Sequence, residues 1–172
     1  MPHEAVIAVR DLRRTYGRRR KQVVAVRDVS FEVNRGEIFG LIGPDGAGKT
    51  SIIQTIAGVL TLQRGSVRLN GIDVATRPDA VKAVTGYMPQ GLGVNLYESL
   101  TVDENIEFFR DLRQLPRADY VRNRTELLNV TRLTPFLDRR ASELSGGMRQ
   151  KLALVCTLCT WPSAPKRLIA TS

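Results

Sequence analysis

Apolar and polar positions follow a strand-like pattern at the start of the chain. Residues 4–9 and 23–33 are rich in valine and partly alternate between apolar and polar side chains, which predicts two strands. A short continuous apolar run at residues 38–42 indicates a third, buried strand. From Thr50 to Leu60 the apolar residues recur close to helical spacing, so we expect a helix soon after this strand.

Short elements follow up to residue 90. Residues 65–74 form two strand-like runs around Asn70-Gly71, a dipeptide typical of a two-residue hairpin turn. Residues 80–84 form a short helical patch, and residues 85–90 are strand-like and end at a loop. The first half of the chain therefore predicts several strands with two helices among them.

Beyond Leu100 the pattern becomes helical. Thr101 and Glu104 have the spacing of a capping box, in which the two side chains satisfy backbone N–H groups at the start of a helix. The apolar face predicted for this helix consists of Ile106, Phe108, Phe109 and Leu112. Further helices are expected at residues 118–130 and 148–158. This order predicts an α/β fold into which a helical segment is inserted.

Length and composition are typical of one globular domain. The chain has 172 residues, of which 42% are hydrophobic and 25% are charged. No run approaches the ~20 apolar residues that a membrane-spanning helix requires. The first residues lack the basic stretch and apolar segment of a secretory signal, so we expect a cytoplasmic location.

The formal net charge of +9 leaves several partners open. Part of the excess lies at Arg13, Arg14 and residues 18–21. A basic surface can face anionic lipid, ribosomal RNA or only solvent. Because aromatic residues are not interleaved with these charges, the support for nucleic acid is weak, and DNA is not expected as a partner.

Cys156 and Cys159 are the only cysteines. Their C-x-x-C spacing occurs in redox and metal sites, but this pair lies in an apolar, helix-like run without partner ligands. We therefore expect two buried thiols.

Residues 43–50 read Gly-Pro-Asp-Gly-Ala-Gly-Lys-Thr and match the phosphate-binding loop pattern G-x-x-x-x-G-K-[ST] in full. Glycines let backbone N–H groups close around a polyphosphate, and the N-terminus of the following helix favours an anion. We expect Lys49 to reach the β- and γ-phosphates and the Thr50 hydroxyl to ligate Mg²⁺. A strand before the loop and a helix after it distinguish this motif from an ordinary glycine-rich turn. The chain is therefore predicted to bind a nucleoside triphosphate.

A second motif, Leu-Ser-Gly-Gly-Met-Arg-Gln, occupies residues 144–150. Its serine and glycines precede a helix, so a hydroxyl and backbone N–H groups could form a second anion cradle. Taken alone, the motif could equally be a plain helix cap with Ser145 as the capping residue. The two motifs in this order resemble the phosphate loop and the signature motif of ATP-binding cassette (ABC) ATPases, and the resemblance extends to about Leu158.

The resemblance implies a fold and a domain organisation. The fold is a P-loop NTPase (ABC ATPase-like) core with an N-terminal antiparallel β subdomain and a helical insert, incomplete at the C-terminus. Residues 1–92 would form the β subdomain and the phosphate-loop core, residues 93–143 the insert, and residues 144–172 the signature motif and a truncated remainder of the core.

The resemblance also implies the roles of individual residues. Tyr16 resembles the aromatic residue that stacks on adenine, and Gln90 resembles the glutamine that contacts Mg²⁺ and the attacking water. Lys49 and Gln90 would then be the catalytic residues, with Thr50 and Gln90 at the metal. Asp45 stands where many cassettes carry Asn, which adds a negative charge near the phosphates. The nucleotide-binding residues implied are Tyr16, Gly43, Pro44, Asp45, Gly46, Ala47, Gly48, Lys49, Thr50, Ser51, Gln90, Leu144, Ser145, Gly146, Gly147 and Gln150.

Partners follow from the resemblance as well. In this family two cassettes sandwich two ATP molecules head to tail, and the signature motif of one closes on the γ-phosphate held by the other. A second cassette, identical or different, and a transmembrane permease subunit are therefore implied. The stretch around Gln90 looks particularly like ABC-2-type multidrug exporters and a related ribosome-associated ATPase. It implies a peripheral position at the inner face of the membrane or, alternatively, on a ribosome.

Residues that the family uses for hydrolysis are missing from this sequence. In the family an apolar strand ends in Asp-Glu and is followed by a D-loop and a switch histidine. Here no Asp or Glu follows Glu143, residues 168–170 stand about where that strand should lie, and the only histidine is His3. Each lost electrostatic or positioning interaction lowers the rate by roughly 10²–10³-fold. We expect the ATP-binding chain of an ABC exporter with little or no turnover; the alternatives are a ribosome-associated soluble ATPase and a non-catalytic remnant.

Overall fold

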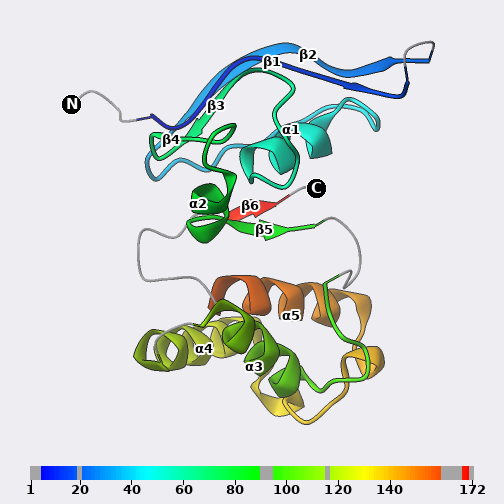
Figure 1. The fold of residues 1–172 in the computed structure, drawn as a ribbon. Coiled ribbons are helices and arrows are strands. Elements are labelled where there is room, and N and C mark those ends of the chain that lie inside the picture. Colours follow the sequence, from blue (N-terminus) through cyan, green and yellow to red (C-terminus); the bar gives the residue numbers. More distant parts are fainter. Residues whose placement is uncertain (1–4, 19–20, 90–94, 115–116, 160–167, 171–172) are drawn as a thin grey trace. The chain divides into compact units, whose positions relative to one another are not determined.

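The computed structural model describes residues 5–18, 21–89, 95–114, 117–159 and 168–170. It divides into two compact units, an N-terminal unit that ends at Thr85 and a C-terminal unit that runs from Gly86 to Ala170 (Figure 1).

A four-stranded antiparallel sheet with the strand order β2-β1-β3-β4 dominates the N-terminal unit (Figure 1). The strands are β1 (Ala5–Tyr16), β2 (Val23–Asn34), β3 (Arg64–Leu69) and β4 (Ile72–Asp73). The two N-terminal strands and the hairpin are thus confirmed, with β1 longer than predicted. At the hairpin turn the φ angles of Asn70 and Gly71 are 50° and 75°, the positive values that a type I′ turn requires.

Two short helices accompany this sheet. Helix α1 (Lys49–Ile56) follows the phosphate-binding loop, and α2 (Pro78–Ala83) follows β4. α1 packs on the sheet and contacts β1, β2 and β3. The core between them contains buried side chains from both: Val9, Leu12, Ile52, Ile53, Ile56, Val67 and Leu69.

The buried strand predicted at residues 38–42 is not observed. Residues 37–44 have no regular secondary structure, and Ile38 and Ile42 are fully exposed. A strand requires a hydrogen-bonded neighbour, and none of the strands in the described part of the chain pairs with this run. Residues 38–42 are apolar, but an apolar sequence does not by itself provide a neighbouring strand.

The C-terminal unit combines three helices with a short parallel strand pair. β5 (Gly86–Met88) pairs in parallel with β6 (Leu168–Ala170). Helices α3 (Val102–Arg113), α4 (Arg117–Thr131) and α5 (Gly146–Cys159) confirm the three predicted helices. The 3₁₀ turns η1 (Thr134–Phe136) and η2 (Ala141–Glu143) connect α4 to α5. None of the described helices is long and apolar enough to cross a bilayer.

The helices of this unit enclose one hydrophobic core. It contains Val102, Ile106, Tyr120, Leu128, Leu133, Leu144, Leu152, Val155, Cys156 and Cys159. Both cysteines are free thiols and buried, as predicted. Burial raises the pKa of Cys159 to about 12 and that of Cys156 well above its usual range.

The capping box at the start of α3 is confirmed. Thr101 Oγ1 accepts a hydrogen bond from Glu104 N (3.1 Å), and Glu104 Oε2 accepts one from Thr101 N (2.8 Å). The predicted apolar face is wrong in part, because Leu112 is 66% exposed and Phe108 is 37% exposed. The fully buried Asn105 lies on the core side instead, and its amide bonds the backbone of Tyr97, Leu100 and Thr101.

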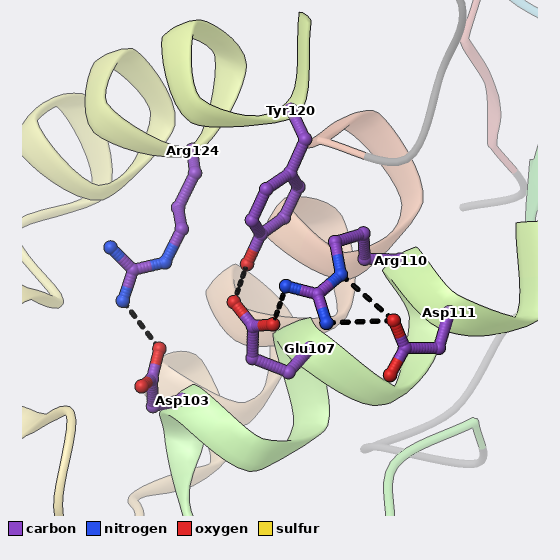
Figure 2. Close-up of polar contacts among 6 residues, drawn as sticks. All are labelled: Asp103, Glu107, Arg110, Asp111, Tyr120 and Arg124. Atoms are coloured by element: carbon purple, nitrogen blue, oxygen red, sulfur yellow. Dashed lines mark hydrogen bonds and ion pairs between the residues drawn. The ribbon is translucent and has the colours of Figure 1, made fainter. Parts of the chain in front are cut away.

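Polar side chains join α3 to α4 (Figure 2). The Tyr120 hydroxyl donates to Glu107, and Arg124 pairs with Asp103. Glu107 also pairs with Arg110, whose guanidinium lies over the Tyr120 ring, 5.2 Å from its centroid. Burial raises the pKa of Tyr120 to about 12, against the lowering effect of Arg124 and Arg110.

Candidate nucleotide site

The phosphate-binding loop rests on the backbone of β2. Gly46 and Gly48 have φ angles of +80° and +83°, in the left-handed region that glycine adopts without strain. A Cβ atom at Gly48 would lie 2.2 Å from the carbonyl oxygen of Ala25, so only glycine permits this approach. At Gly46 an added Cβ would meet no atom within 4 Å. The loop therefore packs closely against β2 at Gly48, whereas there is free space for a side chain at Gly46.

The lysine of the motif lies where the loop enters α1. Lys49 Nζ donates to the carbonyl oxygens of Gly43 (2.6 Å) and Pro44 (3.1 Å) and so lies against the loop. No side chain caps α1 at Gly48, and its first turn holds no acidic residue. The positive end of the helix dipole therefore adds to the charge of Lys49 and favours an anion. The charge of Lys49 and the helix N-terminus are compatible with a polyphosphate, and the phosphate contacts of residues 43–50 stay a prediction.

Tyr16 lies beside this helix. The residue ends β1, and its hydroxyl is 2.9 Å from Ser51 Oγ in the first turn of α1, although 35 residues separate the two in sequence. The guanidinium of Arg14 lies over the ring, with its central carbon 4.8 Å from the ring centroid. Tyr16 remains 42% exposed. Sequence reasoning missed Arg14, because nothing in one sequence shows that its side chain meets the ring.

The remaining predicted residues of the N-terminal unit are exposed at the loop and on α1. Asp45 and Ala47 are in the loop, and Thr50 follows Lys49 on α1. Within the described ranges no three His, Cys, Asp or Glu side chains form a metal-binding group. Gln90, the other residue predicted to contact Mg²⁺, lies outside the described residues, as does His3.

The signature motif forms an exposed helix start in the C-terminal unit. Leu144 is buried in the core, whereas Ser145, Gly147 and Gln150 are exposed. Ser145 Oγ accepts a hydrogen bond from Met148 N (3.3 Å), so the serine caps α5. This is the helix cap given above as the alternative reading of the motif, and the second anion cradle stays a prediction.

Further contacts hold this motif in place. Arg149 pairs with Glu98 at 3.7 Å. The backbone just before the motif forms hydrogen bonds with the segment just before α3. Ala141 N donates to Leu100 O (2.9 Å), and Ser142 N donates to Glu98 O (3.1 Å). The chain on both sides of Ser145, Gly146 and Gly147 is therefore connected to the segment before α3.

A loop with this sequence and a helix that starts at its lysine are typical of P-loop nucleotide-binding proteins. The family model described as "ABC transporter" matches residues 26–164, and the chain belongs to this family as an ATP-binding domain. The predicted fold class, an ABC ATPase-like P-loop fold with an N-terminal antiparallel sheet, is confirmed by the similarity to solved cassettes.

Two curated relatives show the kind of protein that this chain resembles. It is 42% identical to the "Probable multidrug ABC transporter ATP-binding protein YbhF" of Escherichia coli, over 93% of this chain and 27% of that protein. It is 33% identical to the "Doxorubicin resistance ATP-binding protein DrrA" of Mycobacterium tuberculosis, over 92% of this chain and 47% of that protein. The chain thus spans less than half the length of either relative.

A solved structure shows the same fold. The ATP-binding cassette MJ0796, in a dimeric post-hydrolysis state bound to ADP and Pi, superimposes with a TM-score of 0.78 at 23% identity. The match covers 95% of this chain and 72% of that one.

Proposed function

We propose that this chain binds MgATP and is the ATP-binding part of an ABC exporter, coupling nucleotide binding and hydrolysis to transport through a separate membrane subunit. The contact of Tyr16 with Ser51 supports the nucleotide site most directly, because it puts an exposed aromatic ring beside the phosphate-binding loop. In the sequence, only the family resemblance implies that Tyr16 stacks on adenine.

Each residue of the site has a defined task in this proposal. Lys49 and the backbone N–H groups of residues 45–50 would hold the phosphates, and the Tyr16 ring would stack on the adenine. Thr50 and Gln90 would hold Mg²⁺, which neutralises phosphate charge when bound. Lys49 already lies at the loop through its bonds to Gly43 and Pro44, so it would exchange two carbonyl oxygens for phosphate oxygens.

Partners follow from the family and from the exposed signature motif. A second cassette, identical or different, would place the serine and glycines of residues 144–147 against the nucleotide of its partner. The dimeric MJ0796 cassette with ADP and Pi supports this arrangement. The names of YbhF and DrrA support export and, with it, a cytoplasmic position at the inner face of the membrane.

Hydrolysis by this 172-residue chain would be weak. β6 pairs with β5 where the family's Asp-bearing strand is expected, yet its sequence is Leu-Ile-Ala and continues with Thr171-Ser172. No Asp or Glu occurs among residues 144–172. Residues 144–172 therefore supply neither the carboxylate that would complete the metal site nor the one that would orient the attacking water, and each is worth roughly 10²–10³-fold in rate.

Two measurements on the purified chain test this function, with Lys49→Ala as the matched control. MgATP binding by titration calorimetry should be clear for the wild type and weak or absent for Lys49→Ala. ATP turnover should be indistinguishable between the two. Absence of binding by the wild type would refute the proposed site. Turnover clearly above that of Lys49→Ala would show that another group orients the water, with Gln90 the first to be tested.

A further inference from the structure

Two neighbours fix the ring of Tyr16. Its hydroxyl lies 2.9 Å from Ser51 Oγ, which ties one end of the side chain to α1. The guanidinium of Arg14 lies over the ring at 4.8 Å from the centroid, which is within the range of a cation–π interaction. With 42% of the residue exposed, an aromatic base can still reach it.

Arg14 is itself held in position. Its Nη1 donates to the carbonyl oxygen of Thr61 (2.8 Å), which anchors the guanidinium to the chain beyond α1. Its Nε is buried without a hydrogen-bond partner among the described residues. An arginine bound in this way cannot move off the ring without breaking a hydrogen bond.

Arg14 also interacts with other groups than the neighbouring arginines of β1 do. Arg10 pairs with Glu32, and Arg13 Nη1 lies 3.3 Å from Asp28 Oδ2. In the part of the chain that the structure describes, Arg14 has no carboxylate partner, and its guanidinium faces the Thr61 carbonyl oxygen and the Tyr16 ring. Arg14 therefore differs from the two arginines before it on β1, which form ordinary surface ion pairs.

We propose that Arg14 is a positioning residue for the nucleotide base. Resting on the proposed function, this assigns Arg14 one face of the Tyr16 ring and leaves the other face for the adenine. A ring whose orientation is fixed before binding loses less conformational entropy when a base stacks on it.

This role acts on the base and not on the phosphates, which separates it from a structural role. Arg14→Gln should weaken MgATP binding about 2–5-fold, the range expected for one exposed cation–π contact. Its effect on magnesium tripolyphosphate, which has no base, should equal that of Arg13→Gln. That control removes the same charge from the same strand without touching the ring.

The experiment is calorimetric titration of the full chain with both ligands, for the wild type, Arg14→Gln, Arg14→Lys and Arg13→Gln. Arg14→Lys keeps the charge and should retain most of the MgATP affinity. In a Tyr16→Ala background, Arg14→Gln should have no further effect on MgATP. The expected result is therefore a loss that depends on both the base and the ring.

Each other outcome overturns the inference. Equal weakening of MgATP and tripolyphosphate by Arg14→Gln, beyond that of Arg13→Gln, would make Arg14 structural. If Arg14→Gln weakens MgATP binding as much in the Tyr16→Ala background as in the wild type, or does not weaken it in either, Arg14 does not act through the Tyr16 ring. A wild-type chain that binds neither ligand would refute the proposed function itself, whereas wild-type binding of MgATP with an unchanged Arg14→Gln variant refutes only the role of Arg14.

Discussion

Replacing Gly48 by alanine tests how the phosphate-binding loop is built. The new Cβ would lie 2.2 Å from the Ala25 carbonyl oxygen and 3.0 Å from Val26 Cγ2, so the loop or β2 must move. The φ angle of +83° adds the penalty of the left-handed region, about 1–2 kcal/mol for a residue with a Cβ. Forcing extra atoms into a packed region costs about 1–3 kcal/mol more. The expected loss in unfolding free energy is roughly 2–5 kcal/mol.

Gly46→Ala is the matched control. Gly46 has nearly the same φ angle, +80°, but an added Cβ there would meet no atom within 4 Å. It should therefore lose only the backbone contribution, about 1–2 kcal/mol. The difference between the two variants isolates the contact with β2.

Thermal unfolding of the full chain, followed by circular dichroism, measures both changes. At about 2–4 °C per kcal/mol for a chain of this size, Gly46→Ala should lower Tm by about 2–8 °C and Gly48→Ala by about 4–20 °C. Gly48→Ala should also weaken MgATP binding, since the loop must shift to relieve the clash. Equal losses in Tm for the two variants would refute the reasoning, because the loop would then not depend on the approach to Ala25.

Two further predictions concern the C-terminal unit. Because burial raises the pKa of Tyr120 to about 12, above the ~10 of an unfolded chain, its protonated hydroxyl stabilises the fold below pH 10, and this contribution of at most about 3 kcal/mol is lost between pH 10 and 12. Between pH 10 and 12, urea unfolding should show a smaller loss of unfolding free energy for Tyr120→Phe than for the wild type. Identical dependence of unfolding free energy on pH for the two proteins would contradict the prediction. Cys156 and Cys159, whose pKa values burial raises, should not react with Ellman's reagent at pH 8 until guanidinium unfolds the chain. Reaction of the folded protein at the rate of free cysteine would show that the thiols are accessible.

The features predicted best from the sequence are those that depend only on residues close together in the chain. The capping box of Thr101 and Glu104 and the Asn70-Gly71 turn each depend on a few adjacent positions, and both formed as expected. The phosphate-binding loop is likewise a local pattern, and its lysine lies at the loop. The fold class was implied by the resemblance to ABC ATPases, which rests on two such local motifs, residues 43–50 and residues 144–150.

Contacts between distant residues could not be predicted in this way. The strand expected at residues 38–42 depends on a partner, and apolar composition does not provide one. The meeting of Tyr16 with Ser51, and of Arg14 with the Tyr16 ring, depends on how β1 lies against α1. A single sequence contains no signal for such an approach.

The buried face of α3 shows a different limit. The apolar side chain of Leu112 predicts that it lies on that face, but it is exposed. Asn105 is buried there instead, and its amide forms four hydrogen bonds with the backbone. Hydrophobic periodicity ranks a leucine above an asparagine at every position. It therefore cannot anticipate a buried amide that closes a turn.

The irregular pairing of β1 with β2 bears on whether β2 can pair with a strand of another molecule. β2 is an edge strand of the described sheet, and an edge strand can recruit a strand from another molecule. Its register against β1 shifts at four places, and Asp11 and Asp28 have φ angles of 48° and 47°. Such bulges increase the local twist and interrupt the row of backbone groups that a second molecule would need. Together with the charges of Arg27, Asp28 and Glu32, they make this 12-residue strand a poor template for aggregation.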